Sequence, residues 1–186
     1  MKYYKAILNL SQEPNALTFD SPINITGFEL KKLNYGDTIS VPNPIIFSID
    51  LGDGTQELDV NLSISGSIIV SAKFKNLFSN ESLRFYPIKT DNYETKEQYY
   101  ILEILDFCDC IDENNTKITY WTEANTSFNK RLVGNYKSLF DIHLIHHKIE
   151  TNIFRLKKYS AMIIVNQYFV DIFEENHCSG WKFASI

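Results

Sequence analysis

The sequence predicts a strand-rich α+β protein with few helices, and three observations support this. Aromatic residues make up 14 % of the 186 residues. Isoleucine occurs 23 times and alanine only 6 times; isoleucine and aromatic residues favour strands, whereas alanine favours helices. The third observation is an internal repeat, in which a strand, a helix and a second strand occur twice. We therefore expect two related β-α-β units packed on a mainly antiparallel or mixed sheet.

The length of the chain indicates one domain, residues 1–186. Its N-terminal region, residues 1–60, is expected to consist of strands and turns. Apolar runs that end at turn residues predict strands here, at Lys2–Leu10 and Ile45–Leu51. The segment Phe28–Leu33 fits either a strand or a helical turn.

The repeat lies in the remaining part of the domain, residues 61–186. Ser67–Phe78 aligns without a gap with Met162–Phe173. In each copy an apolar strand is followed by a residue that favours the N-cap position, Ser71 in the first and Asn166 in the second. Apolar residues then follow at helical spacing and predict one apolar face for each helix: Phe74, Leu77 and Phe78 in the first copy, and Phe169, Ile172 and Phe173 in the second.

A second strand is predicted after each helix. Leu83–Ile88 and Trp181–Ile186 both alternate and both end in isoleucine. The two β-α-β units therefore extend over about residues 67–88 and 162–186. Since each helix has only two to three turns, neither is stable in isolation. We expect each to pack its phenylalanine face onto a sheet.

The segment between the units adds further strands. Tyr99–Cys110 is a long apolar run and predicts one core strand. Alternation would place Tyr99, Ile101 and Glu103 on one face of this strand, and Tyr100, Leu102 and Ile104 on the other. Further strands are predicted at Lys117–Thr122 and Asn152–Lys157, whereas Ser138–Ile149 fits either a helix or a strand.

Composition and charge exclude several classes of protein. The net charge is −5, so a general nucleic-acid binder is not expected, because such proteins carry a basic field. No apolar stretch is long enough to cross a bilayer, and the N-terminal segment lacks the apolar core of a signal peptide. We therefore expect a cytoplasmic protein that acts without a membrane and without a cofactor.

The cysteines do not predict a disulfide scaffold or a metal site. There are three, Cys108, Cys110 and Cys178, an odd number in a chain expected in the cytoplasm. Cys108 and Cys110 are separated by one residue, a spacing that matches no usual zinc motif. Free thiols are the expectation.

Histidines supply the one alternative with metal chemistry. His143 and His147 have i, i+4 spacing, so a helix would place both on one face, as in zinc proteases. The glutamate that follows the first histidine in that motif is Leu144 here. A small metal-dependent hydrolase using this pair therefore stays an alternative, although the base of the motif is missing.

Carboxylates gather at the end of the predicted central strand and in the following loop, and they form the candidate binding site for a partner. The acidic rim, as we call it, consists of Asp106, Asp109, Asp112 and Glu113. Carboxylates at such a rim can steer a basic partner. An ordinary polar loop is the alternative interpretation. No arrangement of residues in the chain predicts a catalytic centre.

Short motifs in a fixed order connect this chain with a known family. They are Ile69-Val70-Ser71-x-x-Phe74-x-x-Leu77-Phe78, Phe85-Tyr86-Pro87-Ile88, Tyr99-Tyr100-Ile101-Leu102, Ile153-Phe154-Arg155-Leu156-Lys157, Ile164-Val165-Asn166 and Gly180-Trp181-Lys182-Phe183. Over residues 60–186 the chain resembles a family of immunity proteins from bacterial polymorphic-toxin systems. Two positions depart mildly: a Pro-Asp pair of the family is Leu58-Asp59 here, and its helix-capping serine is Asn166.

This resemblance implies a function. Immunity proteins of this kind are not enzymes; they bind and neutralise a cognate toxin made by the same cell. The net charge of −5 suits a basic toxin. Besides the hydrolase, a structural subunit that forms oligomers through its two related units is the remaining alternative.

Overall fold

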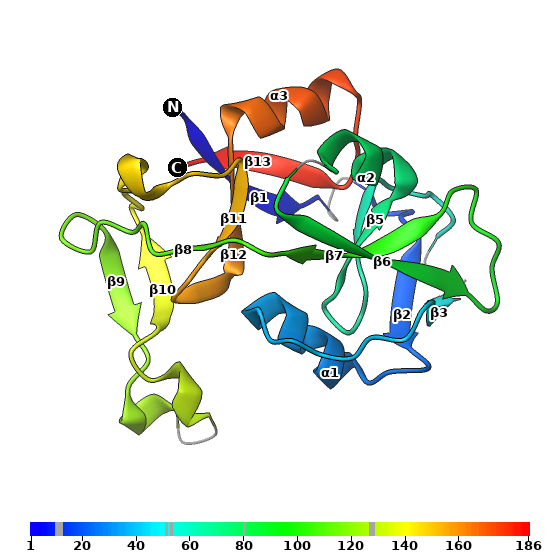
Figure 1. The fold of residues 1–186 in the computed structure, drawn as a ribbon, viewed down its shortest axis with the longest axis horizontal. Coiled ribbons are helices and arrows are strands. Elements are labelled where there is room, and N and C mark those ends of the chain that lie inside the picture. Colours follow the sequence, from blue (N-terminus) through cyan, green and yellow to red (C-terminus); the bar gives the residue numbers. More distant parts are fainter. Residues whose placement is uncertain (10–12, 51, 53, 80, 127–128) are drawn as a thin grey trace.

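The computed structural model describes residues 1–9, 13–50, 52, 54–79, 81–126 and 129–186. Its strands form two large sheets and a two-stranded ribbon, accompanied by three α-helices, so the predicted α+β class is confirmed (Figure 1). The helices are α1 (Gly27–Lys31), α2 (Ala72–Phe78) and α3 (Gln167–Glu175). In the described part of the chain, no helix is long and apolar enough to span a membrane.

Both large sheets are mixed. The six-stranded sheet has the order β2 (Thr18–Pro22), β3 (Ile45–Asp50), β6 (Leu83–Thr90), β7 (Tyr99–Ile104), β5 (Ile68–Ser71) and β4 (Val60–Leu62). The five-stranded sheet has the order β13 (Trp181–Ser185), β1 (Tyr3–Leu8), β12 (Tyr159–Asn166), β11 (Ile153–Leu156) and β8 (Phe107–Cys108). The ribbon pairs β9 (Lys117–Tyr120) with β10 (Tyr136–Phe140) and projects at one side of the molecule (Figure 1).

The two β-α-β segments have the same internal arrangement. In the first, β5 and β6 both pair antiparallel with β7, so they run parallel to each other with β7 between them. In the second, β12 and β13 both pair antiparallel with β1, which lies between them. The strand between β5 and β6, which is β7, follows the first unit in the chain, whereas β1, the strand between β12 and β13, comes from the beginning of the chain. Each unit is therefore a split β-α-β motif completed by a strand from outside it.

Each of the two helices begins at a side-chain cap. The hydroxyl of Ser71 accepts a hydrogen bond from the backbone N–H of Phe74 at 3.2 Å. The side-chain oxygen of Asn166 accepts one from the N–H of Phe169 at 3.0 Å. These bonds satisfy N–H groups that the first turn of a helix leaves unpaired.

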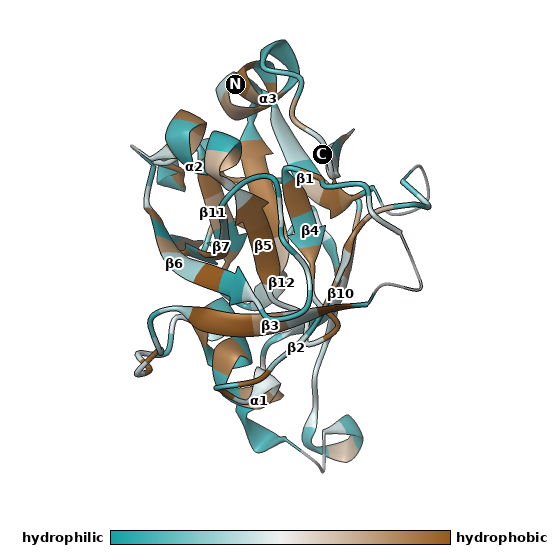
Figure 2. Cartoon of the chain, turned by 90° about the vertical axis from the view of Figure 1, so that its right-hand side faces the viewer, coloured by the Kyte–Doolittle hydropathy of each residue, from teal (hydrophilic) through white to brown (hydrophobic). Residues whose placement is uncertain are grey.

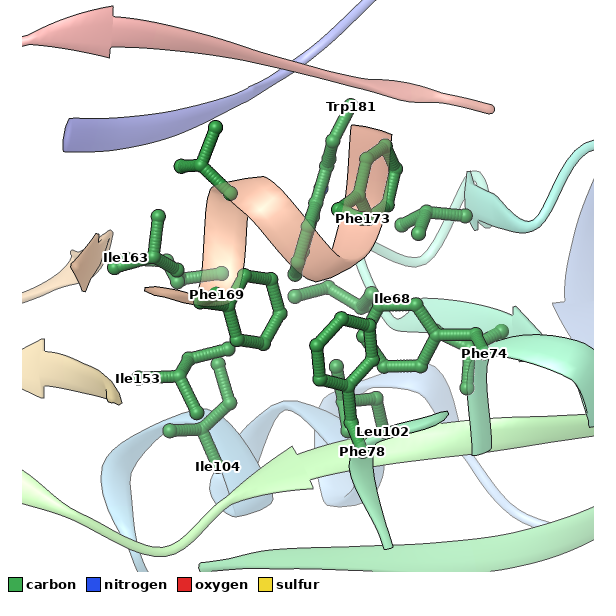
Figure 3. Close-up of a cluster of buried hydrophobic side chains, with 14 residues drawn as sticks. Ile68, Phe74, Phe78, Leu102, Ile104, Ile153, Ile163, Phe169, Phe173 and Trp181 are labelled. Atoms are coloured by element: carbon green, nitrogen blue, oxygen red, sulfur yellow. The ribbon is translucent and has the colours of Figure 1, made fainter. Parts of the chain in front are cut away.

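The phenylalanine faces of α2 and α3 pack against each other, as well as against the sheets (Figure 3). Phe78 and Phe169 stack with their ring centroids 4.0 Å apart and their planes at 16°. Phe74 meets Phe173 edge to face at 6.5 Å, and Trp181 lies 5.7 Å from Phe74. The four phenylalanines and Trp181 are nearly inaccessible to solvent, whereas Leu77 and Ile172 are half-buried at the border of this core. The two units therefore share one core.

A carboxylate joins the two units at the end of this core. Asp59 accepts hydrogen bonds from the hydroxyl of Ser71 (2.8 Å), from the backbone N–H of Ser179 (3.0 Å) and from Nζ of Lys73 (3.2 Å). Its own N–H donates to the hydroxyl of Ser179 at 3.0 Å. Asp59 thus connects the cap of α2 with the loop that precedes β13. This is the acid of the Leu58-Asp59 pair.

We expect Asp59→Asn to lower the free energy of unfolding by about 1–3 kcal/mol, because an amide turns an NH₂ group toward donors that need an acceptor. The midpoint of urea unfolding measures this. Asp171→Asn is the matched control, because Asp171 is exposed and accepts one bond, from Gln167 at 2.8 Å. Equal midpoints for both variants would show that the Asp59 contacts do not stabilise the fold.

Two further apolar clusters flank the shared core. One lies on the face of the six-stranded sheet toward α1 and includes Phe19, Phe47 and Ile101. The other lies beside the five-stranded sheet and includes Phe154, Ile164 and Tyr136 of the ribbon. In Figure 2, β5 in the interior is hydrophobic along its length, whereas the helices carry one hydrophobic and one hydrophilic side.

Some sequence predictions need correction. Tyr99–Cys110 is not one strand: it is interrupted at Leu105 and Asp106, so that β7 belongs to one sheet and β8 to the other. The alternation predicted for β7 is confirmed, since its two faces belong to different clusters. The ambiguous segment Phe28–Leu33 forms α1 and the start of a 3-10 helix, and Ser138–Ile149 begins as strand β10. Leu10 and Leu51, predicted ends of strands, lie outside the described residues.

Candidate functional site

The acidic rim is spread along the segment that leads from β7 to the ribbon. Asp106 is half-buried between β7 and β8; its backbone carbonyl accepts from the N–H of Arg155 at 2.9 Å. One of its carboxylate oxygens, Oδ2, is buried without a hydrogen-bond partner among the described residues. Asp109 is exposed. The carboxylate of Asp109 is therefore the more accessible of the two.

The other two carboxylates of the rim hold local structure. Asp112 accepts from the side chain of Asn115 (2.7 Å) and from the N–H of Asn114 (3.1 Å), and these bonds, that from Asn115 first, lower its pKa. Glu113 accepts from Lys158 (2.6 Å), from the Tyr136 hydroxyl (2.7 Å) and from the Tyr120 hydroxyl (3.0 Å). These three donors, Lys158 first, lower the pKa of Glu113 to about 2. Glu113 thereby ties the ribbon to the turn between β11 and β12.

We expect Glu113→Gln to destabilise the fold at neutral pH but not at pH 2. Because the folded-state pKa of about 2 lies below the ordinary value of 4.5, the folded protein binds fewer protons than the unfolded chain between these values. The contribution of Glu113 is complete above the ordinary pKa and is lost as the pH falls toward 2. Since the side chain is 41 % exposed, solvent screening limits it to about 1 kcal/mol.

Urea unfolding of the wild type and of Glu113→Gln at pH 7 and pH 2 measures this difference. Glu123→Gln serves as the control, because Glu123 is an exposed glutamate of the same projecting segment. A stability difference that stays constant between the two pH values would contradict the assigned role of Glu113.

The ribbon also carries exposed apolar side chains. Phe140 is 63 % exposed and Tyr120 is 37 % exposed. Trp121, directly after β9, lies under the ammonium group of Lys137 at 5.0 Å from the ring centroid. Aromatic side chains exposed on a projecting element are typical of protein interfaces. The sequence predicted only a strand at Lys117–Thr122 here and did not identify these side chains as a site.

The histidine pair lacks the geometry of a zinc protease. The segment around His143 and His147 is not an α-helix; it contains only a 3-10 turn, His146–Lys148. The ring of His146 packs edge to face on Tyr3 at 5.2 Å. Within the described residues, no group of three or more histidine, cysteine or acidic side chains could hold a metal ion. The helical premise of the hydrolase alternative is therefore wrong.

The cysteines are free thiols in this structure. Cys110 is buried beside the half-buried Cys108, and burial raises the pKa of both thiols. Burial also raises the pKa of Cys178, to about 11. Thiols with raised pKa values are poor nucleophiles at neutral pH.

A pocket of 310 Å³ lies between the chain that follows α1 and the strands β6, β7 and β8. Its base contains Glu103, whose side chain is 5 % exposed. The Tyr86 hydroxyl donates to Oε2 of Glu103 at 2.7 Å, and Nη1 of Arg84 lies 3.2 Å from the same oxygen. We call this the Glu103 pocket. The sequence placed Glu103 on one face of the predicted central strand, together with Tyr99 and Ile101, but did not identify it as a site.

The opposite wall of the pocket is held by a buried cation. Arg155 of β11 is 3 % exposed and donates from Nη2 to the side chain of Asn34 at 2.9 Å. Asn34 belongs to the 3-10 helix Lys32–Tyr35, which forms this wall. Burial lowers the pKa of Arg155 to about 10. The guanidinium therefore fixes the 3-10 helix to the five-stranded sheet.

Comparison with models of known protein families assigns this chain to one family. A model of the Immunity protein family (Imm11) matches residues 9–186. The match reaches well into the N-terminal region, where the sequence motifs alone indicated a resemblance only from residue 60. A search of curated proteins found no match. Because the family model covers nearly the whole chain, the protein belongs to the Immunity protein family (Imm11).

Proposed function

We propose that this protein binds a cognate toxin stoichiometrically and neutralises it by covering part of its surface. The observation that carries this proposal is the family match over residues 9–186. Neutralisation by binding needs a rigid scaffold and a complementary surface, but no reaction. We propose accordingly that the protein is not an enzyme, that it needs no cofactor, and that it acts in the cytoplasm of the cell that makes the toxin.

Two surfaces are suited to the contact. The exposed aromatic side chains of the ribbon, Tyr120 and Phe140, can be buried against a partner. Asp109 of the neighbouring acidic rim is exposed, and a carboxylate at the edge of an interface accelerates association with a basic partner. We propose that Asp106, Asp109, Asp112 and Glu113 border this contact, with Asp112 and Glu113 holding the local structure.

The test pairs the protein with the toxin that the neighbouring gene encodes, in a catalytically inactivated form. We expect a 1:1 complex in size-exclusion chromatography with light scattering, and rescue of cells that express the active toxin. An unrelated toxin is the specificity control. Absence of both complex and rescue would overturn the proposal. The mass of the free protein also distinguishes a monomer from the fixed oligomer that a structural subunit would form.

A further inference from the structure

In the Glu103 pocket, only one of the two carboxylate oxygens of Glu103 accepts hydrogen bonds from the described residues. Both donors that reach Glu103, Arg84 and the Tyr86 hydroxyl, contact the same oxygen, Oε2. No hydrogen bond from the described residues reaches Oε1, and Oε1 is not among the fully buried unpaired atoms. A carboxylate oxygen can accept two hydrogen bonds. Oε1 is therefore an acceptor available to a donor that enters from outside.

Arg84 does not fill the pocket itself. Its side chain is 57 % exposed and comes from the outer edge of the pocket, in register with Glu103 on the paired strand. An ion pair with such an exposed partner is weak and readily rearranged. Of the charged residues that line the pocket, Asp37 and Glu103 are acidic and Arg84 is basic. Arg155 does not line the pocket; it lies behind the wall formed by the 3-10 helix and donates to Asn34 and to the carbonyl of Ser160.

Three aromatic side chains are among the lining residues, Tyr35, Tyr86 and Phe107. Tyr35 is 62 % exposed, and the ring of Phe107 lies against Gly36, the residue that follows Tyr35. The volume of 310 Å³ equals that of about ten water molecules at ~30 Å³ each, enough for one long side chain. Aromatic walls with a carboxylate at the base suit a cation, because ring faces attract positive charge. A guanidinium group fits best, since it is planar, stacks on rings and donates to a carboxylate.

We propose that the Glu103 pocket binds the guanidinium group of an arginine side chain that projects from the toxin. This inference rests on the proposed function, and it adds the chemistry of one contact. The guanidinium would donate to Oε1 of Glu103 and contact the aromatic side chains that line the pocket, with the exposed Asp37 nearby. A buried charge of this kind anchors an interface, whereas charges at the rim mainly affect the association rate.

The first experiment does not depend on the toxin. Backbone amide NMR shifts are recorded while N-acetyl-arginine methylamide is titrated to 20 mM, and the same is done with the neutral isostere N-acetyl-citrulline methylamide. We expect saturable shifts confined to residues 33–39, 84–86 and 103–107 with the arginine probe, and at least tenfold weaker binding of the citrulline probe. Absence of localised shifts, or equal binding of both probes, would overturn the proposal.

Three variants examine the charges of the pocket. Glu103→Gln keeps the shape but removes the charge, and we expect at least tenfold weaker binding of the arginine probe. Asp37→Asn, at the exposed entrance, should weaken it about twofold and remains informative if Glu103→Gln does not fold. Arg84→Gln should tighten binding, because it removes a like charge. Weaker binding of the arginine probe by Arg84→Gln would contradict this assignment of the charges.

The matched control is Glu174→Gln, which changes the net charge equally. Glu174 is exposed on α3, on the opposite side of the molecule from α1 (Figure 1). Binding of the neighbouring gene's toxin is then compared between the two glutamine variants. We expect at least tenfold weaker binding for Glu103→Gln only. If the wild type and Glu103→Gln bind the toxin equally, the pocket has no role in the complex. If the toxin binds neither the wild type nor Glu103→Gln, only the proposed function is overturned.

Discussion

Replacement of Phe169 by alanine is expected to lower the free energy of unfolding by about 3–5 kcal/mol. The Phe169 side chain is completely buried and stacks on Phe78 at 4.0 Å. It also lies 6.3 Å from both Phe74 and Trp181, measured between ring centroids. Its removal would leave a cavity where the two β-α-β units meet, and would remove the stacked ring contact between α3 and α2, leaving the Phe74–Phe173 contact. Such a loss is a large part of the roughly 5–15 kcal/mol by which domains are stable.

Urea unfolding measures this effect, with Tyr168→Ala as the control. Tyr168 is the preceding residue of the same helix and is 57 % exposed, so its truncation should cost less than about 1 kcal/mol. A double-mutant cycle with Phe78→Ala isolates the stacking interaction, for which we expect a coupling of about 0.5–1.5 kcal/mol. A loss below about 1 kcal/mol for Phe169→Ala would contradict the shared core.

Substitution of Gly180 by alanine is expected to prevent folding or to destabilise the protein by more than about 4 kcal/mol. Gly180 has φ = +95°, which strains any residue with a Cβ atom. A Cβ atom at this position would lie 1.9 Å from the carbonyl oxygen of Val60. This carbonyl belongs to β4 and cannot move freely, because the N–H of Val60 donates to the carbonyl of Ser179 at 3.1 Å.

A Gly134→Ala variant separates the two effects expected at Gly180, the backbone strain at positive φ and the clash of a Cβ atom with a neighbouring carbonyl. Gly134 has a similar φ of +83°, but a Cβ atom there would meet nothing within 4 Å. It should therefore cost only the backbone strain, about 1–2 kcal/mol. The yield of folded protein and the urea midpoint of the two variants are the measurements. Equal stability would show that the loop before β13 can move away from β4.

Local patterns predicted much of the secondary structure. Ser71 and Asn166 mark the starts of α2 and α3, because a cap acts between residues three positions apart. The prediction of one continuous strand at Tyr99–Cys110 is wrong, because the apolar pattern continues through the position where the chain passes from one sheet to the other. No local pattern distinguishes an interrupted strand from a continuous one when apolar residues continue through the interruption.

The candidate sites depended more strongly on tertiary contacts. The acidic rim was recognised from composition, but the sequence did not show that Glu113 bonds to Lys158, 45 residues later. The Glu103 pocket was missed because its walls come from segments far apart in the chain, among them Tyr35 and Phe107. A single acidic residue inside an apolar strand, such as Glu103, was the one available signal.

The sequence by itself determined the α+β class, the two strand–helix–strand segments and the relationship to immunity proteins. These follow from apolar periodicity, helix caps and ordered short motifs, which act over a few residues. Only the tertiary structure decided that the phenylalanine faces stack on each other, that β1 and β7 complete the two units, and that Asp59 joins them. The reason is physical: burial of both apolar faces in one core stabilises the fold only after distant segments meet, and the sequence of either segment does not specify its partner.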